Sequence, residues 1–278
     1  MASSPPLSLA DIRRTLATKS LGQRCYLYQE LSSTNAEALS LAQSGAAHGT
    51  VVVAESQSSG RGRHARAWYS PPGTNIYCSI IVRGTGQHPL RVEWLSWIPL
   101  VSALAVVEAV HRVASLQLAL KWPNDLLLHE RKVGGILCES ASASATDPVV
   151  VIGIGLNVNA PRESFPEPLR PIAASLIDST RQPIDRNQLI AQLLFDLEQQ
   201  MGKLGSSGPA RSRQAYVSRC ITLGRRVRVL TGGGHELIGR AEGIAADGAL
   251  QVRPIPSSSA SASSLVDVHA ADIIHVRE

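Results

Sequence analysis

The stretch TVVVAESQSSGRGRHARAWYSPPGTNIYCSIIVR, residues 50–83, places two apolar segments on either side of a loop rich in arginine. The first segment, 50–56, has the composition of a buried strand, and the alternation of apolar and polar residues over 75–83 predicts a second strand. A loop and no helix connects them, so strands and helices do not alternate strictly along the chain. That order favours an α+β fold over a doubly wound parallel sheet.

The segments on either side continue this irregular order. Thr34 and Glu37 form a capping-box pattern that predicts a helix start, and Pro99 favours a later helix that begins only after it. Asp185 is a predicted N-cap. The predicted strands are 25–31, 118–122, a hairpin over 125–140 with its tip at 129–132, and 147–159; the predicted helices are 9–18, 35–44, 100–113 and 185–204.

The composition changes at about Thr222, where short strands separated by turn residues begin. Residues 231–235 are a glycine-rich turn, and Asp247-Gly248 is typical of a type I′ hairpin. These features predict a small β-barrel after the main domain. The chain therefore divides into a lead-in at 1–24, a main α+β domain at 25–221 and an all-β domain at 222–278.

The overall composition is that of an ordinary globular protein. The 278 residues are 44% apolar and 18% charged, with a net charge of +5, which suits an anionic ligand but does not by itself indicate nucleic-acid binding. The four cysteines form no C-x-x-C pair, so neither a zinc site nor a disulfide framework is indicated. A signal-peptide core and any stretch of about 18 uncharged apolar residues are missing, so we expect a cytoplasmic protein without a membrane span.

The arginine-rich loop, residues 59–68, has the chemistry of an anion site. Arg61, Arg63 and Arg66 carry planar guanidinium groups that pair with phosphate or carboxylate, and Gly60 and Gly62 let backbone amides approach a ligand. Two simpler interpretations are a solvated basic loop and a minor-groove DNA arm. The second is disfavoured because this loop is tied between two strands.

Four other stretches gather polar groups at predicted element ends. SSTN, 32–35, lies at the start of a helix, and KWPND, 121–125, surrounds a proline bend. Lys132 precedes Gly134-Gly135, and GIGLNVN, 153–159, puts glycines inside a strand, where close approach of a ligand is the usual compensation. Taken singly, each stretch is also compatible with an ordinary turn or a solvated lysine. No helix follows GIGLNVN, so it is not a dinucleotide fingerprint.

Together, the order and spacing of SSTN, SGRGRHARAW, KWPND, a lysine eleven residues after Lys121, and GIGLNVN resemble the biotin protein ligases. The resemblance covers about 25–278. It implies a mixed-sheet catalytic domain of the biotin/lipoate ligase type, which is similar to class II synthetases, followed by a C-terminal SH3-like barrel. It departs at Ala65, where the family has glycine. If that position needs a positive φ, alanine costs about 1 kcal/mol.

The resemblance implies an ATP-dependent ligase. Biotin and ATP would form biotinyl-5′-AMP, and biotin would then pass to one lysine of the biotin carboxyl carrier protein of acetyl-CoA carboxylase or a related carboxylase. Mg²⁺ would be held mainly by the ATP phosphates, and no metal ligand is assigned to the chain. The fatty tail of biotin needs an apolar wall, which Trp122 could supply.

The resemblance also implies a role for individual residues. Lys132 and Arg63 would be catalytic. The biotin pocket would be formed by Ser33, Thr34, Asn35, Gln57, Gly60, Arg61, Gly62, Arg63, Lys132, Gly135 and Gly153. The nucleotide would be held by Arg63, Arg66, Trp68, Lys121, Asn124, Asp125, Lys132 and Asn157.

Two alternative functions differ in what they explain. A lipoate or octanoate ligase or transferase of the same fold lacks the arginine loop as it stands here. A nucleic-acid-binding module would use the arginines and the barrel but leaves the polar helix start and the strand glycines unexplained. The lead-in is too short for the DNA-binding domain of some relatives, so we expect no DNA and no membrane partner. A homodimer is left open.

Overall fold

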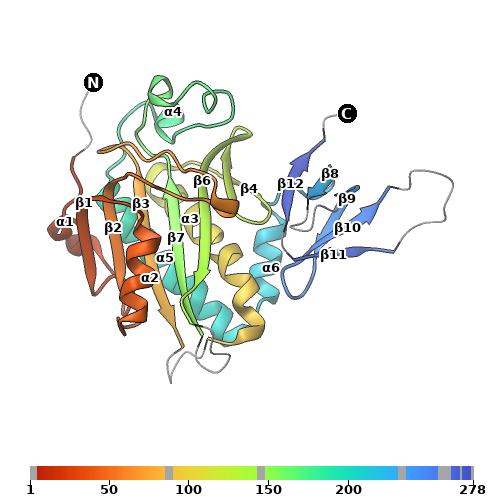
Figure 1. Ribbon diagram of the computed structural model, residues 1–278, viewed down its shortest axis with the longest axis horizontal. Coiled ribbons are helices and arrows are strands. Elements are labelled where there is room, and N and C mark those ends of the chain that lie inside the picture. Colours follow the sequence, from red (N-terminus) through yellow and green to blue (C-terminus); the bar gives the residue numbers. More distant parts are fainter. Residues whose placement is uncertain are drawn as a thin grey trace.

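The computed structural model describes residues 5–84, 90–142, 148–230, 236–255, 264–269 and 271–276. Its main part is a seven-stranded sheet in the order β1-β2-β3-β7-β6-β5-β4 (Figure 1). Only β1 and β2 pair in parallel, and the other neighbours are antiparallel. The strands are β1 (Cys25–Leu31), β2 (Val51–Gln57), β3 (Ile76–Arg83), β4 (Ala119–Lys121), β5 (Asp125–Leu128), β6 (Arg131–Ser140) and β7 (Val149–Leu156). This mixed sheet confirms the α+β prediction.

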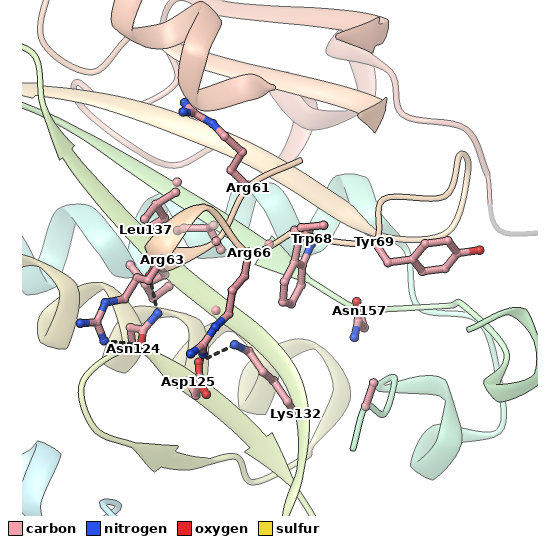
Figure 2. A pocket seen from close by; sticks show the side chains of 18 of the residues that line it. Arg61, Arg63, Arg66, Trp68, Tyr69, Asn124, Asp125, Lys132, Leu137 and Asn157 are labelled. Atoms are coloured by element: carbon pink, nitrogen blue, oxygen red, sulfur yellow. Dashed lines mark hydrogen bonds and ion pairs between the residues drawn. The ribbon is translucent and has the colours of Figure 1, made fainter. Parts of the chain in front are cut away.

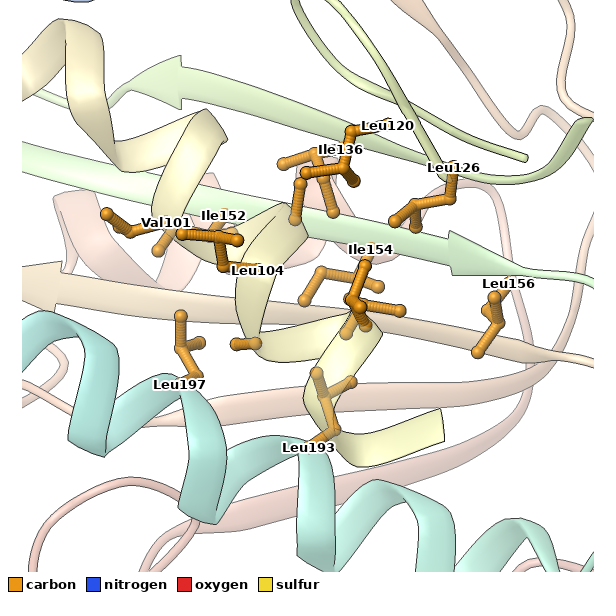
Figure 3. Packing of buried hydrophobic residues seen from close by; sticks show 14 of the residues in the cluster. Val101, Leu104, Leu120, Leu126, Ile136, Ile152, Ile154, Leu156, Leu193 and Leu197 are labelled. Atoms are coloured by element: carbon orange, nitrogen blue, oxygen red, sulfur yellow. The ribbon is translucent and has the colours of Figure 1, made fainter. Parts of the chain in front are cut away.

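The two faces of the sheet carry different neighbours. Helices α3 (Ile98–Ala114) and α5 (Arg186–Ser207) pack on one face against Ile152, Ile154 and Leu156 of β7 (Figure 3). Helix α2 (Thr34–Gln43) covers part of the other face, over Val149 and Val151. Because side chains alternate along a strand, Gly153 and Gly155 continue the α2 face and leave it bare beyond the start of that helix.

The shorter elements connect these layers. Asp185 caps α5 as predicted, since its carboxylate accepts from the backbone N–H groups of Asn187 and Gln188. The remaining elements of the main part are α1 (Leu9–Thr15), η1 (Arg63–Ala65), η2 (Val92–Trp97), η3 (Arg162–Ser164), α4 (Ile177–Thr180) and α6 (Ala210–Val217).

A second, five-stranded antiparallel sheet follows in the order β11-β10-β9-β8-β12. Trp97 donates to the carbonyl of Ala246 over 2.8 Å, and Trp122 donates to that of Gly248 over 3.1 Å, so this sheet is fixed to the main part by two buried indoles. The predicted turn at 231–235 lies outside the described residues. The strands are β8 (Arg226–Leu230), β9 (Glu236–Ile244), β10 (Leu250–Pro254), β11 (Val266–Val268) and β12 (Asp272–His275).

Two of the helix starts, those of α2 and α3, differ from the prediction. Helix α2 begins one residue early, with Ser33 and not Thr34 as its cap, because the Ser33 hydroxyl accepts from the Ala36 N–H. The carboxylate of Glu37 accepts instead from the Tyr28 hydroxyl, so the capping box is wrong. Helix α3 begins at Ile98, because Pro99 lies in the first turn, where its missing N–H costs nothing.

Both predicted hairpin turns also differ in detail. The tip of the β5–β6 hairpin is only His129-Glu130, with φ of 48° and 62°, which places Lys132 on strand β6 and not in the turn. At the β9–β10 connection only Gly248 has a positive φ, of 90°. A type I′ turn needs two such residues, so Asp247-Gly248 is not one.

The segment Val92–Ala114, which joins η2 to α3, is long and apolar enough to cross a membrane by composition alone. However, 67% of its apolar window is buried inside the protein. Its side chains face the sheet and α5, as expected of a core helix of a folded domain.

Candidate active site

Two rows of paired residues cross the bare face of the sheet. In one row, Ser79 of β3, Gly153 of β7 and Leu137 of β6 lie directly opposite one another. In the other, Tyr77, Gly155, Gly135 and Asp125 are paired across four strands. Residues directly opposite each other point to the same face, so these rows form a floor with three missing side chains.

One side chain lies over each of these glycines. A Cβ on Gly153 would lie 2.1 Å from Oδ1 of Asn35, and one on Gly155 would lie 2.7 Å from the Trp68 ring. A Cβ on Gly135 would lie 3.4 Å from Cε of Lys132. The glycines of β7 predict a ligand lying against them. In the structure, Asn35 and Trp68 occupy that space.

Asn35 is fixed by hydrogen bonds. Its Nδ2 donates to the Leu137 carbonyl over 3.2 Å and to Oε2 of Glu139 over 2.7 Å. Its Oδ1 and the hydroxyl of Ser79 are 2.6 Å apart. Because both amide hydrogens and the carbonyl are engaged within the protein, Asn35 sets the shape of the floor.

The neighbouring polar residues form a second chain of contacts. The backbone N–H of Thr34 donates to Oε1 of Gln57 over 2.8 Å, and the Thr34 hydroxyl lies 3.1 Å from the same oxygen. The other end of the Gln57 amide donates to the Ser70 hydroxyl over 3.0 Å. This chain orients the amide of Gln57 beside the start of α2.

Thr34, Asn35 and Gln57 border one cavity of about 510 Å³. It brings together every predicted site residue except Gly60. A Cβ on Gly60 would lie 2.7 Å from both the Trp68 carbonyl oxygen and the Ser70 hydroxyl, so this glycine permits tight packing of the loop behind the cavity. Gly60 does not line the cavity itself, and its assignment to the biotin pocket stays a prediction.

Other lining residues were not predicted from the sequence. Most are apolar and come from the β3, β6 and 165–173 segments, with four from the C-terminal sheet; they include Tyr69, Tyr77, Ile136, Leu137, Phe165, Leu169, Ile172, Ala173, Leu230, Asp272, Ile273 and Ile274. Trp122 also lines the cavity, but its indole is 2% exposed.

Lys132 lies on strand β6, and its side chain extends over the floor formed by the paired rows of β3, β7, β6 and β5. Its Nζ lies 2.5 Å from Oδ1 of Asp125 and 5.4 Å from the centroid of the Trp68 ring (Figure 2). Its backbone is held on both sides, because its N–H donates to the Ile172 carbonyl and its carbonyl accepts from Ala174. Nearby, burial lowers the pKa of Lys121, and the Asp125 carboxylate opposes that shift.

The arginine loop bends through two left-handed residues, His64 with φ of 54° and Ala65 with φ of 55°. The position of Ala65 therefore does have a positive φ, as the departure from the family suggested. Alanine there costs about 1 kcal/mol relative to an unstrained residue. Gly62 donates to the Arg66 carbonyl over 2.7 Å and closes the loop.

Two side chains of the loop contact one carboxylate of the C-terminal sheet. Arg66 forms an ion pair with Asp272, and Nε2 of His64 lies 3.5 Å from the same carboxylate. Arg63 donates to the Ala271 carbonyl over 3.1 Å and to Oδ1 of Asn124 over 3.4 Å. The loop is therefore bound to the other domain, and its charges are partly compensated.

Arg61 behaves differently from the other two arginines. Its side chain is directed away from Arg63 and Arg66 (Figure 2), and its Nη2 lies 3.7 Å from Oε1 of Glu139. Glu139 also accepts from Asn35, so Arg61 supports the residue that shapes the floor. The cationic end of the cavity consists of Arg63, Arg66, Lys121 and Lys132.

Two further polar groups complete the site. Asn157 is 3% exposed and donates to the Ala174 carbonyl over 3.0 Å. Nε1 of Trp68 is buried and has no hydrogen-bond partner among the described residues. Among these residues, no group of three His, Cys, Asp or Glu side chains could hold a metal ion. The cavity thus offers Mg²⁺ at most one or two carboxylates.

The comparisons with known proteins agree on one family. A model of the biotin/lipoate A/B protein ligase family matches residues 27–157, and a model of the biotin protein ligase C-terminal domain matches 222–276. The chain is 34% identical to the biotin--[acetyl-CoA-carboxylase] ligase of Mycobacterium tuberculosis over 98% of this chain and 97% of that protein. It is 34% identical to the bifunctional ligase/repressor BirA of Bacillus subtilis over 88% of this chain and 74% of that protein.

A solved structure extends the likeness to the fold. The biotin protein ligase from Aquifex aeolicus in complex with biotin and ATP matches with a TM-score of 0.75 and 26% identity, over 92% of this chain and 100% of that one. The resemblance drawn from the motifs is therefore confirmed. The C-terminal sheet is consistent with the predicted SH3-like fold.

Proposed function

Because this chain belongs to the biotin protein ligase family, we propose that its 510 Å³ cavity is where biotin is joined to AMP and then passed to a carrier lysine. The activity itself is ATP-dependent biotinylation. The observation that carries the site assignment is that one cavity has two unlike ends. One end presents oriented neutral groups, Thr34 and Gln57, and the other presents four cations. Biotin, a neutral ring with an anionic tail, needs both.

The neutral end suits the ureido ring. This ring has two N–H donors and one carbonyl acceptor, which hydroxyls and amides match without a charge. Ser33, Thr34 and Gln57 supply such groups beside the start of α2, and Asn35 holds the floor in place. Leu137 and Trp68 provide apolar surface for the tail between the two ends.

The cationic end suits the first chemical step. A carboxylate oxygen of biotin attacks the α-phosphorus of ATP, the new P–O bond forms, and the bond to pyrophosphate breaks. Both reactants are anions, so positive charge must offset their repulsion. We assign this role to Lys132, whose ammonium group exchanges Asp125 for the substrate oxygens, with Arg63 beside it.

The arginine loop supplies the lid. The mixed anhydride hydrolyses readily, so water must be excluded until the acceptor arrives. Arg63 and Arg66 already reach across to the C-terminal sheet, and an adenylate phosphate between them offers a better partner than Ala271 or Asp272. Lys121, Asn124, Asp125 and Asn157 complete the proposed nucleotide end.

The second step consumes the adenylate. A neutral acceptor lysine amine attacks the acyl carbon, the C–N bond forms, and the bond to AMP breaks as the amine loses a proton. The curated relatives named biotin--[acetyl-CoA-carboxylase] ligases imply a biotin carboxyl carrier protein as acceptor. Whether this ligase is a homodimer stays a prediction, and so does the absence of a DNA partner.

We assign Mg²⁺ mainly to the phosphate oxygens of ATP. Mg²⁺ commonly binds one or two carboxylates together with substrate phosphates. Asp125 is the carboxylate placed at the nucleotide end, where it now balances Lys132. The division into a catalytic domain at 25–221 and an SH3-like domain at 222–278, and a cytoplasmic location, are likewise retained as proposals.

The proposal is tested by measuring pyrophosphate release with ATP and Mg²⁺ in the presence of biotin, lipoate or neither. Release that depends on biotin alone is expected. Release that depends on lipoate and not on biotin would assign the cavity to a lipoate ligase of the same fold. A carrier domain added afterwards should gain one biotin on one lysine.

A further inference from the structure

The outward face of the C-terminal sheet carries a row of arginines. Arg226 of β8 is paired with Arg240 of β9, which is paired with Arg253 of β10. All three are exposed, whereas the residues next to them on their strands, such as Val227 after Arg226 and Ala241 after Arg240, are buried. Side chains alternate along a strand, so the three guanidinium groups lie side by side on the outer surface.

A second row on the same face mixes one arginine with exposed isoleucines. Ile274 of β12 is opposite Arg228 of β8, which is opposite Ile238 of β9. Ile255 continues the row, because its N–H donates to the Ile238 carbonyl. Ile274, Ile238 and Ile255 are 38%, 36% and 45% exposed, and a group of exposed apolar side chains, unlike a single one, can serve as a contact surface. We name the two rows the arginine face.

The arginine face begins at the mouth of the reaction cavity. Ile274 borders that cavity, and so does Leu230 of β8, which is paired with Asp272. β12 is the strand of the second sheet that lies nearest β4 of the main sheet (Figure 1). A protein that placed a lysine in the cavity mouth would therefore extend over Ile274 and Arg228 onto the two rows.

The charge of the arginine face indicates what it binds. Arg253 is paired with Glu242 over 2.7 Å, whereas no carboxylate lies directly opposite Arg226, Arg228 or Arg240 in the strand pairing. Arg226 and Arg240 have directly opposed positive charges, an arrangement that costs stability and is relieved by an acidic partner. The isoleucines beside them add apolar contact at the centre.

We infer that the arginine face is the docking surface for the acceptor protein, a folded domain that carries acidic and apolar side chains beside its acceptor lysine. The inference rests on the proposed function, because it needs an acceptor. The face contributes affinity and orientation, and the bond-making steps remain in the cavity. Opposite charges of this kind act mainly on the encounter rate and on partner choice.

The test uses the full chain with Arg226→Glu and Arg240→Glu together. The matched control is Lys203→Glu with Arg211→Glu, which makes the same charge change on exposed positions of α5 and α6. Three quantities are measured for each: biotin-dependent pyrophosphate release, transfer of biotin to hydroxylamine, and the KM for a purified biotin carboxyl carrier domain of an acetyl-CoA carboxylase. Circular dichroism and thermal unfolding verify the fold, and Arg226→Gln with Arg240→Gln serves as a milder pair.

We expect the Glu pair to raise the KM for the carrier domain by about tenfold or more, with unchanged pyrophosphate release and hydroxylamine transfer. The Gln pair should shift the KM in the same direction by less, and the control should not. An unchanged KM in the Glu pair overturns the inference, as does an equal rise in the control, which would indicate net charge alone. A wild-type protein that releases no pyrophosphate with biotin overturns the proposed function instead.

Discussion

At the scale of single residues, the site depends on absent side chains. Gly153, Gly155 and Gly135 lie under Asn35, Trp68 and Lys132, so each glycine is needed by a neighbour in the protein. The SSTN and GIGLNVN motifs are thereby explained by one contact, because the asparagine of the first occupies the space left by the first glycine of the second. A methyl group at Gly153 would overlap Asn35.

We therefore expect Gly153→Ala to reduce affinity for biotin by at least about a hundredfold, since displacing Asn35 breaks its contacts with Ser79 and Glu139. Isothermal titration with biotin measures this. Gly202→Ala is the control, because a Cβ there meets nothing within 4 Å and alanine favours helix α5. Equal affinity in Gly153→Ala and wild type would show that Asn35 does not shape the pocket.

Lys132 is the second residue-scale test. Lys132→Ala should slow biotin-dependent pyrophosphate release by about a hundredfold or more, the usual effect of removing one preorganised charge. Lys203→Ala, an exposed lysine on α5, should leave the rate unchanged. A normal rate in a folded Lys132→Ala protein would refute the catalytic assignment.

At the scale of elements, the arginine loop is held by Asp272, which contacts both Arg66 and His64. Asp272→Asn should weaken both contacts and raise hydrogen exchange at the amides of 62–68 in the ligand-free protein by a few fold, as expected of partly exposed ion pairs. Asp267→Asn, on β11 of the same sheet, is the control. Adding biotin and Mg·ATP should lower the exchange again. Identical exchange in Asp272→Asn and wild type would mean that the sheet does not hold the loop.

The sequence predicted most of the elements and most of the polar groups of the cavity, because motifs of consecutive residues place their own polar groups at strand and helix ends. It did not predict Asp272 or Ile274, since a contact between residues about 200 positions apart leaves no local pattern. It did not show that Gly60 packs behind the cavity lining, because a glycine needed for tight packing and a glycine needed for a ligand look alike in a sequence. It misread the cap of α2 because two adjacent hydroxyls, Ser33 and Thr34, both suit an N-cap.

At the scale of the whole molecule, the second sheet carries a half-buried histidine close to Lys121 of β4 in the main sheet. His275 of β12 lies 3.3 Å from the Thr222 hydroxyl and 3.5 Å from a guanidinium nitrogen of Arg225. Burial, followed by the charges of Lys121 and Arg225, lowers the pKa of His275 to about 4, while Glu130 opposes the shift. The folded protein therefore binds this proton less readily than the unfolded chain does.

The sign of the pH dependence follows. Between about pH 6.5, the unperturbed value, and pH 4, the unfolded chain takes up the proton first, so stability falls as the pH falls. Thermal unfolding midpoints across this range should drop less in His275→Gln than in wild type. At pH 7.5 and above, protonation of His275 contributes nothing to the difference. Parallel curves for the two proteins would show that His275 does not contribute to the pH dependence of stability.

We propose above all that one cavity makes and keeps a biotinyl-adenylate. The most direct measurement is native mass spectrometry of the intact protein after incubation with biotin and Mg·ATP, with lipoate in place of biotin as the control. We expect a non-covalent complex that is heavier than the free protein by the mass of one biotinyl-5′-AMP. When the carrier domain is added, this complex should disappear and biotin should appear on the acceptor lysine of the carrier domain. A protein that binds biotin and ATP but never carries the adenylate would contradict this proposal.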